Sequence, residues 1–102
     1  MIDENLESYA LGQIIGFADG LSLYQAEGFD GDLLDGASAR SVWASINALA
    51  EQGQELSLRV VLSDVQARGV SVERTWLMGL VDGVPAPTSA SARDVVGRLG
   101  RL

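Results

Sequence analysis

The sequence contains no histidine, no cysteine and no lysine. Catalytic sites built on an imidazole, a thiol or a Schiff-base lysine are therefore excluded, as are ordinary zinc sites. Asp, Glu, Ser, Thr, Tyr, Arg and backbone N–H groups remain for chemistry, and they form no recognisable catalytic motif. We predict no catalytic residue, no metal and no cofactor. A buried neutral carboxyl group can still perform acid–base chemistry, so an enzymatic role stays open.

Long apolar runs are also missing, because no run approaches the roughly 18 residues that a membrane-spanning helix needs. The segment Met1–Tyr9 is acidic, whereas a secretory signal begins with basic residues. Without cysteine no disulfide can form, which fits a cytoplasmic protein, our prediction, and fits a processed exported protein as well. With 102 residues, 47% of them apolar, we expect a single domain, residues 1–102, with one hydrophobic core.

Basic residues are few, and their distribution is uneven. The net charge is −7; residues 1–39 contain eight acidic and no basic residues, whereas residues 40–102 contain six acidic residues and seven arginines. Binding to nucleic acid requires a basic surface, so this class of partner is not expected. The acidic excess fits a solubilising surface with many turn residues, and alternatively an acidic face for a basic protein partner.

Residues 10–26 allow two structures, and the choice between them decides the fold. Asp19-Gly20 between the apolar runs 13–18 and 21–26 predicts a β-hairpin, because a type I′ turn favours this pair. The alternative is a helix with a stripe of glycines. Its apolar residues would be Leu6, Ala10, Ile14, Phe17, Leu21 and Tyr24. We favour the hairpin, since three glycines inside one helix cost about 1 kcal/mol each.

The remaining elements follow from periodicity and turn residues. Residues 1–8 are expected to form a frayed segment, and the prolines place a loop at 84–90. Residues 38–53 predict a helix that begins at Ser38 and stops at Gly53. Alternating apolar residues predict strands at 55–64 and 70–81, and residues 91–102 predict a short helix.

Together these elements predict an α+β fold in ββαββα order, a small antiparallel sheet with helices on one face. An all-α fold is the alternative, in which residues 54–68 and 71–81 are helices. An open sheet edge in the first fold could also pair with a second copy, so a homodimer is a possible form.

The loop at 26–37 carries the densest group of acidic residues. Its spacing does not match a calcium-binding EF-hand loop, so we assign these acids to turns and helix caps. An exposed aromatic residue in a loop can anchor a partner. The predicted partner-binding patch has an apolar centre and an acidic rim, and consists of Phe29, Asp30, Asp32, Leu33, Leu34 and Asp35.

Two functions follow from these observations. The first is a small acidic interaction module, such as an adaptor, inhibitor or immunity-type protein, that docks a basic protein or associates with itself. The second is a ligand-binding or enzymatic pocket between the sheet and a helix. Its polar groups would be Tyr24, Arg59 and Glu73.

Overall fold

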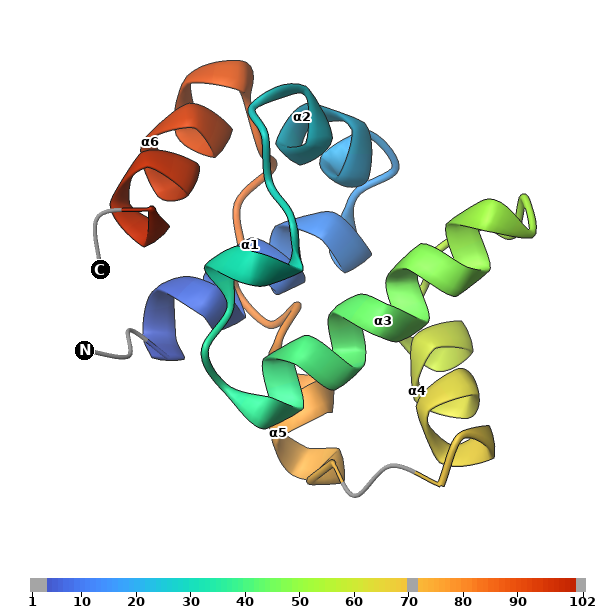
Figure 1. Cartoon of the computed structure of the whole chain (residues 1–102). Helices are drawn as coiled ribbons and strands as arrows, with labels where there is room; N and C mark the ends of the chain where they lie inside the picture. Colours follow the sequence, from blue (N-terminus) through green and yellow to red (C-terminus); the bar gives the residue numbers. More distant parts are fainter. Residues whose placement is uncertain (1–3, 70–71, 101–102) are drawn as a thin grey trace.

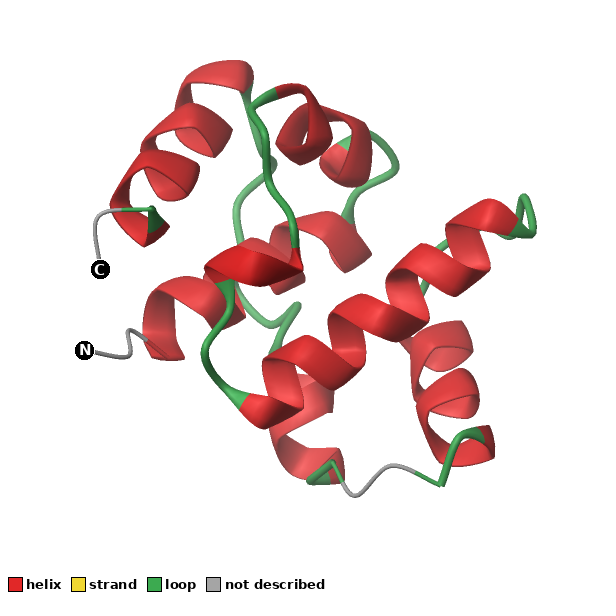
Figure 2. Ribbon diagram, in the orientation of Figure 1, coloured by secondary structure: helices red, strands yellow, loops and turns green. Residues whose placement is uncertain are grey.

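The computed structural model describes residues 4–69 and 72–100. This part of the chain forms helices joined by turns and contains no strand (Figures 1 and 2). The predicted α+β class, its sheet and its ββαββα order are therefore wrong, and the all-α alternative describes the fold. The elements are α1 Glu4–Gly16, α2 Gly20–Ala26, the 3₁₀ helix η1 Gly31–Leu33, α3 Ala37–Glu51, α4 Leu58–Ala67, α5 Arg74–Gly79 and α6 Ser89–Leu99.

The predicted hairpin at 13–26 is instead the end of α1, a turn and α2. Asp19 is the N-cap residue of α2 and Gly20 is its first residue, so the Asp-Gly pair begins a helix. The backbone N–H of Leu23 donates to the carbonyl of Asp19 at 3.0 Å and closes the first turn. A Cβ atom on Gly20 would lie 2.2 Å from the carbonyl oxygen of Gln13. The glycine is therefore needed for the close approach of α2 to α1.

The predicted strand at 55–64 lies mostly in α4. Ser57 is the N-cap residue, and its side chain accepts a hydrogen bond from the backbone N–H of Val60 at 3.2 Å. Val61 and Val65 are four residues apart and both are buried, as expected for one helix face. The same segment also alternates in polarity, so periodicity alone did not separate strand from helix.

The predicted strand at 70–81 is also wrong: it contains the short helix α5, while residues 70–71 lie outside the described residues. The two predicted helices are present. Residues 38–53 contain α3, whose N-cap is Gly36 rather than Ser38, and Gly53 follows it with a φ of 71°. The last helix, α6, begins at Ser89, within the predicted loop 84–90.

Helix α1 lies at the centre of the molecule and contacts α2, α3, α4 and α6 (Figure 1). It occupies part of the segment 1–8 that was expected to fray. All residues from Ala10 to Ile15 are buried, so this part of the helix is covered on every side. The molecule measures 33 × 29 × 25 Å. No helix in residues 4–69 and 72–100 is long and apolar enough to cross a membrane.

Candidate functional site

The segment 28–36, which we call the acidic loop, is held against the core by its apolar residues. Phe29 is 4% exposed and packs edge-on against Tyr24 and Trp43, with ring centroids 5.5 and 4.8 Å apart. Leu34 is fully buried, and Leu33 is half-buried against the core. Phe29 and Leu34 therefore cannot form the exposed apolar centre that the sequence predicted, because both belong to the interior.

Hydrogen bonds fix the backbone of the acidic loop at several points. The side chain of Asp30 accepts from the backbone N–H of Asp32 at 2.8 Å and caps η1. Glu7 in α1 accepts from the backbone N–H groups of Asp35 at 3.1 Å and Gly36 at 3.2 Å. The loop thus has its backbone tied to α1 and its apolar side chains packed in the core.

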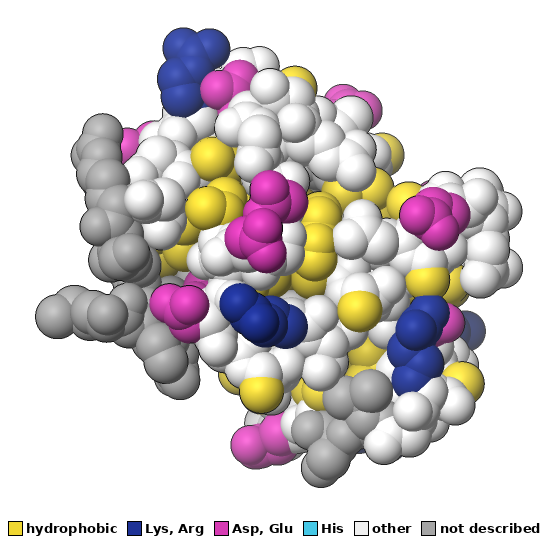
Figure 3. Space-filling model, viewed as in Figure 1, with side chains coloured by type: hydrophobic (Ala, Val, Ile, Leu, Met, Phe, Trp, Pro, Cys, Tyr) yellow, Lys and Arg dark blue, Asp and Glu magenta, His cyan; other side chains and the backbone are white. Residues whose placement is uncertain are grey.

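The acidic side chains of this loop point outward. Asp30, Asp32 and Asp35 are all exposed, so the loop presents three carboxylates on a fixed backbone. In Figure 3 acidic side chains lie around the position of η1, with a basic side chain among them. Arg40 reaches this loop, where its Nε donates to the carbonyl of Leu34. That these carboxylates contact a partner stays a prediction.

Other arginines pair with acids elsewhere on the surface. Each of the three ion pairs in the described part of the chain joins a guanidinium to a single carboxylate at 2.6 to 3.1 Å. The pairs are Arg68–Asp64, Arg93–Glu27 and Arg98–Asp94. None of them includes an acid of the acidic loop, so these arginines do not neutralise its carboxylates.

Glu7 is the acid that the core encloses most completely, at 2% exposed among the described side chains. Both of its carboxylate oxygens accept backbone hydrogen bonds at the segment that enters α3. The N-terminus of a helix carries a partial positive charge, so an anion is favourable at this place. Glu7 therefore fixes the backbone that enters α3, where the N-cap residue Gly36 has no side chain.

A hollow of about 290 Å³ lies beside Glu7, between α1, the start of α3 and α5. A second hollow of about 400 Å³ lies between α1, α5 and the turn after α5. Ser8 and Trp76 line both, so the two hollows flank the same tryptophan. We call them together the Trp76 groove. Its chemically distinctive lining residues are Glu7, Ser8, Tyr9, Ser38, Glu73, Thr75, Trp76 and Asp82.

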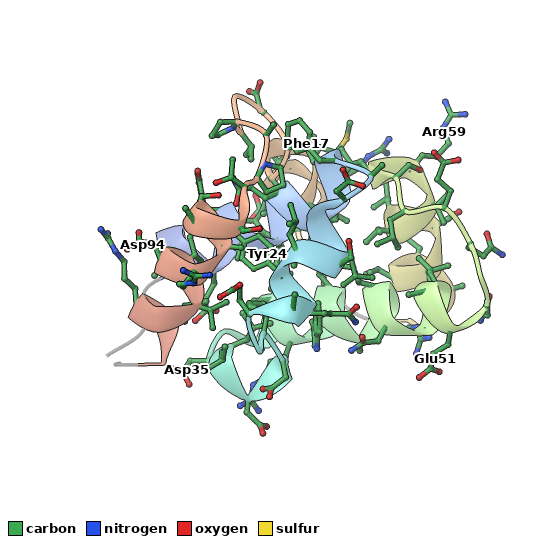
Figure 4. The ribbon with its side chains drawn as sticks, turned by 90° about the horizontal axis from the view of Figure 1, so that it is seen from above. Phe17, Tyr24, Asp35, Glu51, Arg59 and Asp94 are labelled. Atoms are coloured by element: carbon green, nitrogen blue, oxygen red, sulfur yellow. The ribbon has the colours of Figure 1, made fainter. Side chains whose placement is uncertain are left out.

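The predicted ligand pocket is not assembled. Tyr24 is fully buried and donates its hydroxyl hydrogen to Oε1 of Gln13, whereas Arg59 is exposed on α4. Figure 4 shows Tyr24 in the middle of the molecule and Arg59 at its edge. Glu73 lines the Trp76 groove, but Tyr24 and Arg59 line neither half of it. The sheet that was to form one wall is absent from the described residues.

Sequence reasoning missed Glu7 and the groove residues on α1. A detectable signal exists for Glu7, because it lies three, four and seven residues before the buried Ala10, Leu11 and Ile14. An acid on the apolar face of a helix marks a buried carboxylate with a specific partner. Trp76 fell within the predicted strand 70–81, whereas it lies on α5, partly buried against the core.

Within residues 4–69 and 72–100, no three acidic side chains are close enough together to hold a metal ion. Comparison of the chain with protein-family models, with curated proteins and with solved structures finds no match.

Proposed function

We propose that this protein is a small acidic interaction module that docks a basic protein partner. The docking face consists of the acidic loop and the adjoining Trp76 groove. One observation supports this above all: the acidic loop exposes three carboxylates while its backbone is anchored to α1 and its apolar residues to the core. A pre-ordered charged surface loses little conformational entropy when it binds.

The charge of the face fits a basic partner. Complementary charge speeds the encounter of two proteins and selects between partners more than it adds affinity. The acidic loop and the groove adjoin, because Gly36 lies at the end of the loop and lines the groove. We place this function in the cytoplasm, which a chain without cysteine fits. Homodimerisation through a sheet edge loses its basis, since the described residues contain no strand.

The test is a capture experiment with two matched triple variants. The first neutralises the acidic loop with Asp30→Asn, Asp32→Asn and Asp35→Asn. Asparagine caps helices as well as aspartate does, so the cap of η1 is retained. The control neutralises three exposed acids outside the docking face with the same change in net charge. These are Asp19→Asn, Glu51→Gln and Glu55→Gln.

The tagged protein is incubated with lysate of the source cells and washed at about 50 mM and then at about 500 mM salt, where charge screening is much stronger. We expect a basic protein to be retained at low salt by the unmodified chain and by the control variant, and to be lost at high salt. The loop variant should lose it at both salt concentrations. Equal retention by the two variants contradicts the proposal.

A further inference from the structure

Among the described residues, the charged side chains that line the Trp76 groove are all of one sign. Glu7, Glu73 and Asp82 line it, whereas none of the arginines in residues 4–69 and 72–100 does. Arg74 directly follows Glu73 and is exposed, but it is not among the lining residues. The groove therefore offers negative charge to a ligand and no cation to compete for it.

The groove also has aromatic walls. Trp76 lines both halves and is partly buried against the core, and Tyr9 lines the second half. A cation placed over the face of a tryptophan is attracted by the electrons of the ring, and among protein side chains arginine makes this contact most often. The planar guanidinium can stack on an aromatic ring and donate hydrogen bonds to a carboxylate at the same time.

Glu73 is placed to receive such hydrogen bonds. It is exposed and occupies the N-cap position of α5, but its side chain makes no capping hydrogen bond. Its carboxylate is therefore not engaged by its own helix. Glu7 differs, because both of its oxygens already accept backbone hydrogen bonds. Glu73 would therefore contact a cation directly, whereas Glu7 would attract it electrostatically from a longer distance.

The size of the first hollow fits a single side chain. Its volume of about 290 Å³ is at the lower limit of pockets that hold drug-sized molecules, which measure about 300–1,000 Å³. We propose that the Trp76 groove receives an arginine side chain from an extended segment of the basic partner, with the guanidinium on Trp76 and against Glu73. This inference rests on the proposed function, since it specifies how that partner is recognised.

Asp35 lies one residue before Gly36, which lines the hollow. A segment that leaves the hollow on this side passes the acidic loop, where further basic residues would meet exposed carboxylates. The groove would thus select one arginine, and the loop would attract the basic residues around it. The two parts of the docking face can be tested separately.

Nuclear magnetic resonance can observe the groove directly, because the chain has only two tryptophans. Trp43 is buried in the core and Trp76 is only partly buried, and a Trp43→Phe variant assigns their two indole N–H signals. The probe is a synthetic peptide of three arginines alternating with glycines. The matched control peptide carries citrulline, which has nearly the same shape as arginine but no charge.

We expect the arginine peptide to shift the Trp76 indole signal in a saturable manner and to leave the Trp43 signal in place. Glu73→Gln should weaken this binding about two- to fivefold, the size of an exposed ion pair. Glu51→Gln changes the net charge equally and should leave the affinity unchanged. Glu51 is the last residue of α3, whereas Asp35 precedes its first residue, and Figure 4 shows the two side chains far apart.

An unmoved Trp76 signal, an equal response to the citrulline peptide, or equal effects of the two Glu→Gln variants would overturn the inference. Failure of the proposed function has a different signature. If the Trp76 response is present but the loop variant captures its partner normally, the arginine site stands and the acidic loop has no docking role. Loop-dependent capture without a Trp76 response refutes the arginine site alone.

Discussion

The carboxylate of Glu7 accepts a hydrogen bond of 3.2 Å from the backbone N–H of Gly36, 29 residues further along the chain. Its other oxygen accepts from the backbone N–H of Asp35 at 3.1 Å. One buried side chain of α1 thus holds the end of the acidic loop and the entry to α3. The stability of the fold and the geometry of the docking face depend on the same residue.

Replacing Glu7 should therefore destabilise the protein. Glu7→Gln keeps the size of the side chain but replaces a charged acceptor with a neutral amide, and hydrogen bonds to charged groups contribute more. We expect a loss of about 1–2 kcal/mol in the free energy of unfolding, measured by urea denaturation. Glu51→Gln, at the exposed far end of α3, should change it by less than about 0.5 kcal/mol. Equal stabilities of the two variants would show that the two hydrogen bonds of Glu7 add nothing measurable to the free energy of unfolding.

Replacing each of two helical glycines by alanine should change the stability of the protein in opposite directions. A Cβ atom on Gly12 in α1 would lie 2.0 Å from the carbonyl oxygen of Leu80, so the backbone after α5 would have to move. We expect Gly12→Ala to cost about 1–3 kcal/mol. A Cβ atom on Gly97 in α6 would meet nothing within 4 Å. Gly97→Ala should instead stabilise the protein by about 0.5–1 kcal/mol, because alanine favours a helix.

Thermal denaturation of the two variants checks this pair. The midpoint should fall for Gly12→Ala and rise for Gly97→Ala. A shift of the same sign in both would mean that intrinsic helix propensity, rather than the contact with Leu80, governs the first site.

The glycines also explain why the sequence was misleading about the fold. Gly12, Gly16 and Gly20 were counted against a helix because each lowers helix propensity. In the structure Gly12 and Gly16 face the turn after α5, at Leu80 and Val81, and Gly20 faces α1. Close backbone contacts therefore require Gly12 and Gly20, whereas a Cβ atom on Gly16 would lie 3.4 Å from Val81, an ordinary contact distance. An argument from helix propensity has no access to such contacts. The regular apolar stripe of α3, by contrast, was enough to predict that helix.

The candidate site was predictable only in part. The sequence placed Asp30, Asp32 and Asp35 in a loop, and all three are exposed. It also placed Phe29 outside, because no periodic partner for it was visible. Phe29 packs instead on Tyr24 and Trp43, from two different helices. Such a contact joins residues without regular spacing, so it could not be read from periodicity.

The cap of α6 offers a test of local structure. The side chain of Thr88 accepts from the backbone N–H of Ser91 at 3.0 Å, and the Ser91 hydroxyl accepts from the backbone N–H of Thr88 at 2.8 Å. Thr88→Ala should cost about 1 kcal/mol, whereas Thr88→Ser keeps the acceptor and should cost much less. Urea denaturation measures both. If serine fails to restore stability, the threonine methyl group rather than its hydroxyl is what matters.

Gln13, fully buried in α1, joins three segments of the chain. Its Nε2 donates to the hydroxyl of Tyr9 and to the carbonyl of Pro85, each at 3.1 Å, and its Oε1 accepts from Tyr24. Burial raises the pKa of Tyr24 far above its usual value of 10.0, and the nearby Tyr9 adds to the shift. Tyr24 therefore stays protonated in the folded protein at pH values where an unfolded chain would lose this proton.

The pH dependence of stability follows from this difference. Below pH 10 Tyr24 is protonated in both the folded and the unfolded state, so its contribution to the free energy of unfolding is fully present. As the pH rises above 10, the unfolded state releases the proton while the folded state retains it. The unfolded state is then favoured, so the free energy of unfolding should fall. Tyr24→Phe removes this group and should make the fall between about pH 10 and pH 12 shallower.

The same variant has a separate effect at neutral pH, because it leaves Oε1 of Gln13 buried without the hydrogen bond from Tyr24. We expect a loss of about 1–3 kcal/mol at pH 7. Urea denaturation at pH 7 and across the alkaline range measures both effects in one series. Curves for the unmodified protein and Tyr24→Phe that run parallel above pH 10 would mean that Tyr24 ionises as readily in the folded state as in the unfolded chain. A variant as stable as the unmodified protein at pH 7 would instead show that Gln13 finds another donor.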